Sequence, residues 1–90
     1  MVYDGLGERH QALRYFHQAL SIRVEVGDRA GERVTRYNMA MIYRVQGQLA
    51  EAVAALRQVV ALDEQVQHPD LASNQAMLRQ VEQEWRASLA

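Results

Sequence analysis

The chain has 90 residues, which limits it to one small domain, and 49% of them are apolar, enough to form a buried core. Its formal net charge is −1, so no overall field attracts nucleic acid or an anionic membrane. Cysteine is absent, which excludes disulfides, thiolate catalysis and cysteine-bound zinc. No apolar run approaches the roughly 18 residues of a membrane span, so we expect a soluble cytoplasmic protein.

The hydrophobic spacing predicts an all-α fold with about four main helices, at residues 8–26, 29–46, 48–67 and 69–88. Gly5 and Gly7 lie so close together that we expect a turn within residues 1–7. The first helix then follows with apolar residues on one face. Gly27 is expected to end it, and Asp28 to cap the next helix.

The second predicted helix, 29–46, is apolar around most of its circumference. Such a helix must be covered on more than one side, so we expect it to be the central element, ending at Gly47. The third predicted helix carries a single apolar stripe, and the fourth is amphipathic. Pro69 suits the first helical position of the fourth helix.

An internal repeat appears when the sequence is shifted by 40 residues. Gly7 then falls on Gly47 and Phe16 on Leu56, and further apolar positions match at Ala12/Ala52, Leu13/Val53, Ala19/Val59, Leu20/Val60 and Ile22/Leu62. A period of this size indicates helical hairpins that stack as a short α-solenoid. We therefore expect a single domain over residues 1–90, with a partial repeat at 1–28, a full repeat at 29–68 and a terminal capping helix at 69–90.

The full repeat resembles the tetratricopeptide repeat family. Asn38, Met39, Ala40 and Tyr43 are followed by the turn residue Gly47 and then by Ala52, Leu56 and Val59, in the family's order of small and bulky positions. The 40-residue period is similar to that of the long-helix variants in kinesin light chain, LGN-type polarity scaffolds and bacterial signalling proteins. The fourth helix departs from the pattern, because Arg79, Gln80 and Gln83 stand where apolar, small and Tyr residues belong. Polar residues there suit an end cap.

The resemblance implies a protein–protein interaction scaffold that is not an enzyme, binds no cofactor and belongs to a larger signalling or regulatory protein. Its partner is then a protein or peptide, with no nucleic acid or membrane. The second and fourth helices would line the groove with Tyr37, Asn38, Met41, Arg44, Met77, Val81 and Glu84. In related long-helix repeats an Asn at the position of Asn38 holds a peptide backbone, for which a side-chain amide has both donor and acceptor. A hydrogen bond between neighbouring helices is the equal alternative.

Self-assembly is the alternative function. The first helix lacks its hairpin partner in the sequence, so the side bearing Leu13, Phe16 and Leu20 is expected to be partly exposed. Such a patch favours dimerisation or end-to-end stacking, which would make the protein a homo-oligomer.

The remaining polar residues predict no catalytic or metal site. His10 and His17 lie two turns apart, which is poor metal geometry, and His68 is interpreted as a cap or solvated residue in a turn. The neighbouring acids Asp63 and Glu64 do not share a helix face, so we interpret both as solvated. No phosphate-binding loop, nucleophile motif or zinc-protease motif is present.

Overall fold

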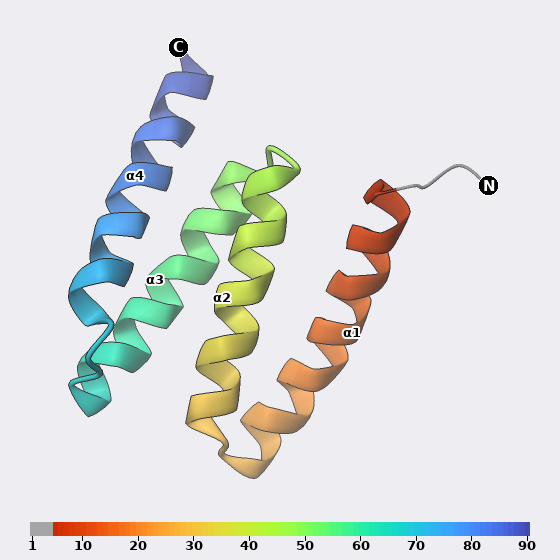
Figure 1. The fold of residues 1–90 in the computed structure, drawn as a ribbon, viewed down its shortest axis with the longest axis vertical. Helices are drawn as coiled ribbons and strands as arrows, with labels where there is room; N and C mark the ends of the chain where they lie inside the picture. The colour runs from red at the N-terminus through yellow and green to blue at the C-terminus, as the bar shows by residue number, and fades with distance from the viewer. Residues whose placement is uncertain (1–4) are drawn as a thin grey trace.

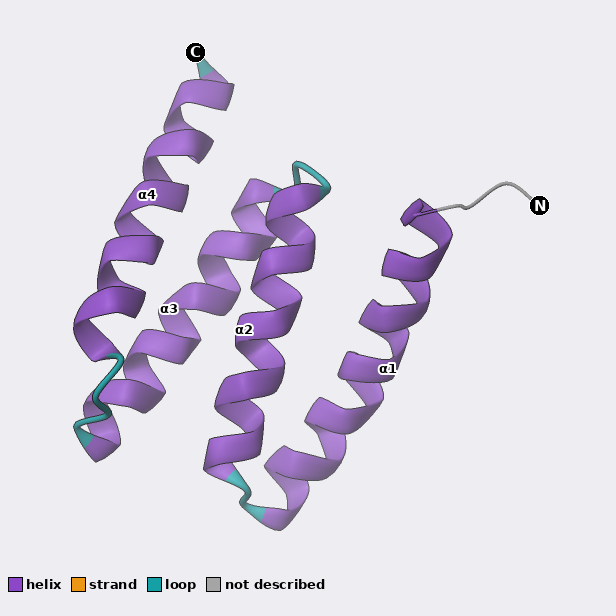
Figure 2. Ribbon diagram, viewed as in Figure 1, coloured by secondary structure: helices purple, strands orange, loops and turns teal. Residues whose placement is uncertain are grey.

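The computed structural model describes residues 5–90, which form four α-helices and no strand (Figures 1 and 2). They are α1 (Gly5–Val26), α2 (Arg29–Val45), α3 (Leu49–Val66) and α4 (Leu71–Leu89). The predicted all-α fold is confirmed, and most of the observed helix ends lie within two residues of the predicted ones. The exception is the start of α1, which comes three residues early.

Each helix packs against the next one in chain order. α1 packs on α2, α2 on α3 and α3 on α4, and successive helices run antiparallel (Figure 1). The overall dimensions of 43 × 35 × 18 Å describe a slab about one helix pair thick. This arrangement confirms the predicted short solenoid of stacked hairpins.

The hydrophobic core lies where α2, α3 and α4 meet. It contains Ala40, Ala52, Val53, Leu56 and Val81, each at most 1% exposed. The small side chains of Ala40 and Ala52 allow the helices to approach closely, and the larger ones fill the space beside them. Half-buried side chains close the core at its edges: Tyr37, Met41, Tyr43, Leu49, Ala55, Met77, Leu78 and Trp85.

The most deeply buried helix is α3, with six buried residues against three in α2. The prediction that α2 is covered on more than one side is confirmed, although Val34 and Val45 are still 51% and 68% exposed. α2 does contact two helices, α1 and α3, but these leave one side of it open. Exposed apolar residues on that open side explain why the sequence of α2 is apolar around most of the helix circumference.

The helix ends follow the predicted turn chemistry. Gly27 and Gly47 have φ of +76° and +77°, a left-handed conformation that glycine adopts without a Cβ penalty. The Asp28 carboxylate accepts the backbone N–H of Gly31 at 2.9 Å and thereby caps α2, as predicted. Pro69 is not the first residue of α4, because the turn continues through Asp70, which is the N-cap.

The 40-residue equivalence holds at the carboxyl ends of α1 and α3. Gly27 and its counterpart Gln67 both have positive φ. The Asp28 N–H donates to the Arg23 carbonyl at 2.8 Å, and the N–H of its counterpart His68 donates to the Asp63 carbonyl at 2.9 Å. The two helices therefore end in the same hydrogen-bonded motif.

The equivalence fails at the amino end of α1. Gly7 is helical whereas Gly47 lies in a left-handed turn, so the predicted turn is wrong for residues 5–7, and residues 1–4 lie outside the described part. A glycine costs a helix only about 1 kcal/mol relative to alanine, so it weakens a helix without ending it. Phe16 and Leu56 also differ: Phe16 is half-buried and Leu56 is fully buried. α3 packs between two helices, whereas α1 packs mainly on α2.

Candidate functional site

Two of the predicted groove residues form an ion pair that joins α2 to α4. The Arg44 guanidinium donates to both carboxylate oxygens of Glu84, from Nε at 3.0 Å and from Nη2 at 2.5 Å. Its Nη1 also lies 3.5 Å from the sulfur of Met77. The hydrogen bonds to Arg44 hold the pKa of Glu84 below its ordinary value, and the same bonds raise the pKa of Arg44. The two charges are thus neutralised within the chain.

The uncovered side of α2 carries a row of four residues, Val34, Asn38, Met41 and Val45, which we call the α2 row. Their spacing of four, three and four residues places them on one helix face. Val34, Asn38 and Val45 are exposed, and Met41 is half-buried against the core. The side-chain amide of Asn38 has no hydrogen-bond partner among residues 5–90, which disfavours its interpretation as a link between neighbouring helices.

Sequence reasoning placed Asn38 and Met41 in the groove but missed Val34 and Val45. The signal was present, because both valines lie at heptad-like spacing from Met41. Both belong to the apolar set that runs around most of this helix in the sequence. Two exposed valines in line with a half-buried methionine make an apolar surface on this side of α2.

Tyr37 and Val81, also predicted in the groove, differ in position. Tyr37 is half-buried and lines a depression of about 340 Å³ together with Arg33, Val34, Asp70, Ser73 and Asn74, at the amino ends of α2 and α4. Val81 is fully buried in the core and cannot touch a partner, so its assignment to the groove surface is corrected. The apolar stripe of α4 faces α3, and Val81 lies on that stripe.

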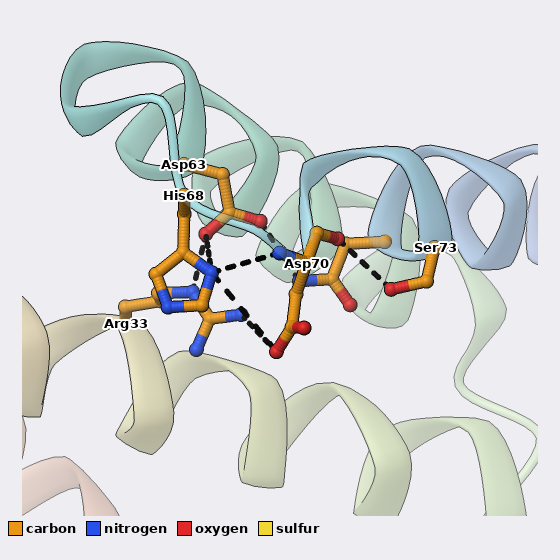
Figure 3. Close-up of polar contacts among 6 residues, drawn as sticks. Arg33, Asp63, His68, Asp70 and Ser73 are labelled. Atoms are coloured by element: carbon orange, nitrogen blue, oxygen red, sulfur yellow. Dashed lines mark hydrogen bonds and ion pairs between the residues drawn. The ribbon is translucent and has the colours of Figure 1, made fainter.

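A buried polar cluster, missed from the sequence, joins α2, α3 and α4 (Figure 3). The Asp63 side chain is 0% exposed, and its Oδ1 accepts a hydrogen bond from Nε of Arg33. Its Oδ2 accepts the side-chain N–H of Asn74 at 2.8 Å. Arg33 also lies 3.4 Å from the Asp70 carboxylate. The interpretation of Asp63 as solvated is therefore wrong, whereas that of Glu64, which is exposed, agrees with the structure.

His68 lies at the rim of this cluster, which we call the Asp63 cluster (Figure 3). Its Nδ1 accepts the backbone N–H of Asp70 at 3.0 Å, a bond within the turn that precedes α4. The same nitrogen is 4.0 Å from the carboxylates of Asp63 and Asp70. His17 lies elsewhere, 3.2 Å from the Tyr43 hydroxyl across the α1–α2 contact. Within residues 5–90, no three histidine or acidic side chains gather in a way that could hold a metal ion.

The predicted self-association face on α1 is largely turned toward its neighbour. Leu13 is buried, and Phe16 and Leu20 are half-buried. Leu13 is therefore not available to a second molecule, because the stripe that it begins packs on α2. Among the residues whose side chains the structure describes, the large exposed apolar ones at this end are instead Tyr15, Ile22, Val24 and Val26.

A family profile described as tetratricopeptide repeat matches residues 1–65, which include α1, α2 and all but the last residue of α3. Searches of curated proteins and of solved structures gave no significant match. No helix within residues 5–90 has the length and hydropathy needed to cross a bilayer.

Proposed function

The chain belongs to the tetratricopeptide repeat family, and from this premise we propose that it is a protein-interaction module. We propose that a segment of another protein binds to the α2–α4 face, by which we mean the surface that carries the α2 row and the Arg44–Glu84 pair. The observation that supports this proposal most directly is the α2 row. Its valines are exposed although the same helix buries Met39 and Ala40 on other sides. A partner segment that covers the row would remove this apolar surface from water.

The chemistry of the row defines the kind of partner. Val34, Met41 and Val45 offer apolar contacts, and the amide of Asn38 offers a donor and an acceptor to a peptide backbone. Arg44 and Glu84 already satisfy each other, so they present a neutral pair. We therefore propose that the partner contributes apolar side chains and backbone groups, and that binding depends only weakly on salt.

The polar residues of the Asp63 cluster have a structural use in this proposal, since they connect three helices. We assign them no catalytic role. The 40-residue period further supports a place within a larger cytoplasmic signalling or regulatory protein, by analogy with the long-helix repeats that the sequence resembles.

Peptides selected from a displayed random library against the immobilised 90-residue chain provide the test. The dissociation constant of a selected peptide is then measured by calorimetry for Val34→Glu, Val45→Glu and Asn38→Ala. We expect each valine substitution to weaken binding at least about tenfold and Asn38→Ala to weaken it by about tenfold, which corresponds to roughly 1.4 kcal/mol.

The matched control is Ala61→Glu, which adds the same charge at an exposed position of α3. It should leave the dissociation constant within about twofold of the wild-type value. Circular dichroism of each variant checks that the fold is intact. Selected peptides that bind Val34→Glu and Val45→Glu as tightly as the wild type would show that the α2 row is not the binding face.

A further inference from the structure

The outer side of α1 carries a row of apolar residues that no described helix covers. Ala12, Tyr15, Ala19, Ile22 and Val26 alternate at spacings of three and four residues, and we call them the α1 seam. Tyr15, Ile22 and Val26 are 65%, 61% and 70% exposed. Tyr15, Ala19, Ile22 and Val26 also line a shallow depression of about 350 Å³, whose edge is formed by Gln18 and by Arg23 and Asp28, which are paired with each other. Alternation of three and four is the spacing at which the side chains of a second helix interlock.

The counterpart of this seam inside the chain is covered by a helix over most of its length, whereas Val66 at its end is 60% exposed. A shift of 40 residues gives the row Ala52, Ala55, Val59, Leu62 and Val66 on α3. Ala52 and Val59 are fully buried. Leu62 and Val66 share a depression with Ala30 and Val34 of α2. Where the hairpin is complete, α2 therefore lies on this row, and the shape of the α1 seam suits a helix in the same place.

End-to-end stacking does not supply that helix. The other end of the slab is α4, which exposes Arg79, Gln80, Gln83 and Arg86. Packing these side chains on an apolar seam would bury charges and amides without partners, which is costly. A second α1 has the opposite character, because it presents an identical apolar seam.

The α1 seam is complementary to itself in an antiparallel arrangement. If Ala12 of one copy lies opposite Ile22 of the other, Tyr15 lies opposite Ala19. The layers built from these four residues then each pair one small side chain with one large one, which fills space evenly, whereas Val26 lies beyond them, opposite Glu8 of the other copy. A parallel arrangement in register would place Tyr15 against Tyr15 and Ala19 against Ala19, giving crowded and empty layers in turn.

We propose that two copies of this chain associate through an antiparallel α1–α1 contact along the α1 seam. The contact does not involve the α2–α4 face, so it is independent of the function proposed above. Its two-fold axis passes near residues 17 and 18. The dimer would extend the layer of helices, with α1 of each copy in the place that α2 occupies over α3.

Sedimentation equilibrium of the 90-residue chain over a range of concentrations tests the association. We expect a reversible monomer–dimer equilibrium, and we expect Ile22→Glu to raise the dissociation constant at least about tenfold. Val24→Glu is the matched control, because Val24 is also exposed on α1, at 51%, but lies on a different face. It should leave the dissociation constant unchanged. A monomer mass at every concentration up to about 1 mM, or equal dissociation constants for Ile22→Glu and the wild type, would overturn the proposal.

The absence of native cysteine permits a test of orientation by crosslinking. Gln18 and Gln11 are both exposed and flank the seam on the same side. Near the two-fold axis, Gln18→Cys should form a disulfide-linked dimer under mild oxidation, whereas Gln11→Cys should not. Equal crosslinking of the two variants would contradict the antiparallel arrangement, since only a parallel pair places both positions alike.

Discussion

Replacing Asp63 with alanine should destabilise the fold far more than any change at the neighbouring Glu64. The Asp63 carboxylate is fully buried and accepts hydrogen bonds from Arg33 and from Asn74. Its removal loses a charge-assisted hydrogen bond, worth about 1.5–3 kcal/mol. It also leaves the amide of Asn74, which is 7% exposed, without its partner, at a cost of about 1–3 kcal/mol.

These terms sum to roughly 2.5–6 kcal/mol, which includes the range of about 3–5 kcal/mol found when one member of a buried ion pair is removed. The lower end applies here, because the Arg33 side chain is 15% exposed and retains Asp70 as a second partner. We therefore expect Asp63→Ala to lower the free energy of unfolding by about 3 kcal/mol. In a domain of this size that corresponds to a fall in Tm of about 12–24 °C.

Urea unfolding, followed by far-UV circular dichroism and by the fluorescence of Trp85, measures the change. Trp85 packs against the core and reports on the α3–α4 contact. The control is Glu64→Ala, one residue away and exposed, which should change the unfolding free energy by no more than about 0.5 kcal/mol. If Asp63→Ala costs less than about 1 kcal/mol, or no more than Glu64→Ala, then the reasoning from burial and hydrogen bonding is refuted.

Two further predictions concern the turn at Gly47 and the pair across the groove. Gly47→Ala should lower the free energy of unfolding, measured in urea, by about 1–2 kcal/mol, because φ at this residue is +77°. Gly47→Asn should lower it by a smaller amount, since asparagine adopts this conformation more readily than alanine. Equal losses for the two variants would contradict this cause. The folded-state pKa of Glu84 lies below its ordinary 4.5, so its stabilising effect is present above that pH and is lost as the pH falls through the lowered pKa. Acid titrations should therefore show a smaller loss of stability for Glu84→Gln than for the wild type.

Much of the fold could be predicted because its determinants are local. Gly27 and Gly47 mark left-handed turns, Asp28 precedes a helix that it caps, and the 40-residue shift preserves the positions that pack between helices. The same local reasoning misjudged Gly7. A glycine pair weakens a helix by an amount that neighbouring helix-forming residues can offset, so the residue type alone does not locate a turn.

The buried polar contacts could not be predicted from the sequence, because they depend on how the helices pack against one another. Asp63 and Glu64 look alike in the sequence, and only the packing of α3 between α2 and α4 buries one and exposes the other. A signal did exist, since Asp63 lies seven residues after Leu56 and therefore on its buried face. Its partners, Arg33 and Asn74, are 30 and 11 residues distant and could not be assigned to it from spacing.

The candidate binding face stays a prediction, from which the burial of Val81 removes one residue. The sequence pattern identified α2 and α4 as its helices and placed Asn38 and Met41 on it. It did not show that Val81 faces α3, because the stripe of an amphipathic helix does not reveal which neighbour it meets. Whether a partner occupies the face remains a prediction that the peptide experiment addresses.

The ion pair between Arg44 and Glu84 makes the two repeats non-interchangeable. These residues stand 40 positions apart, so the same site in successive hairpins carries a positive charge first and a negative charge next. An array built by duplicating residues 29–68 would set arginine against arginine at each junction, with repulsion in place of the bidentate contact. Sequence divergence between the repeats thus fixes the order in which the hairpins can follow one another.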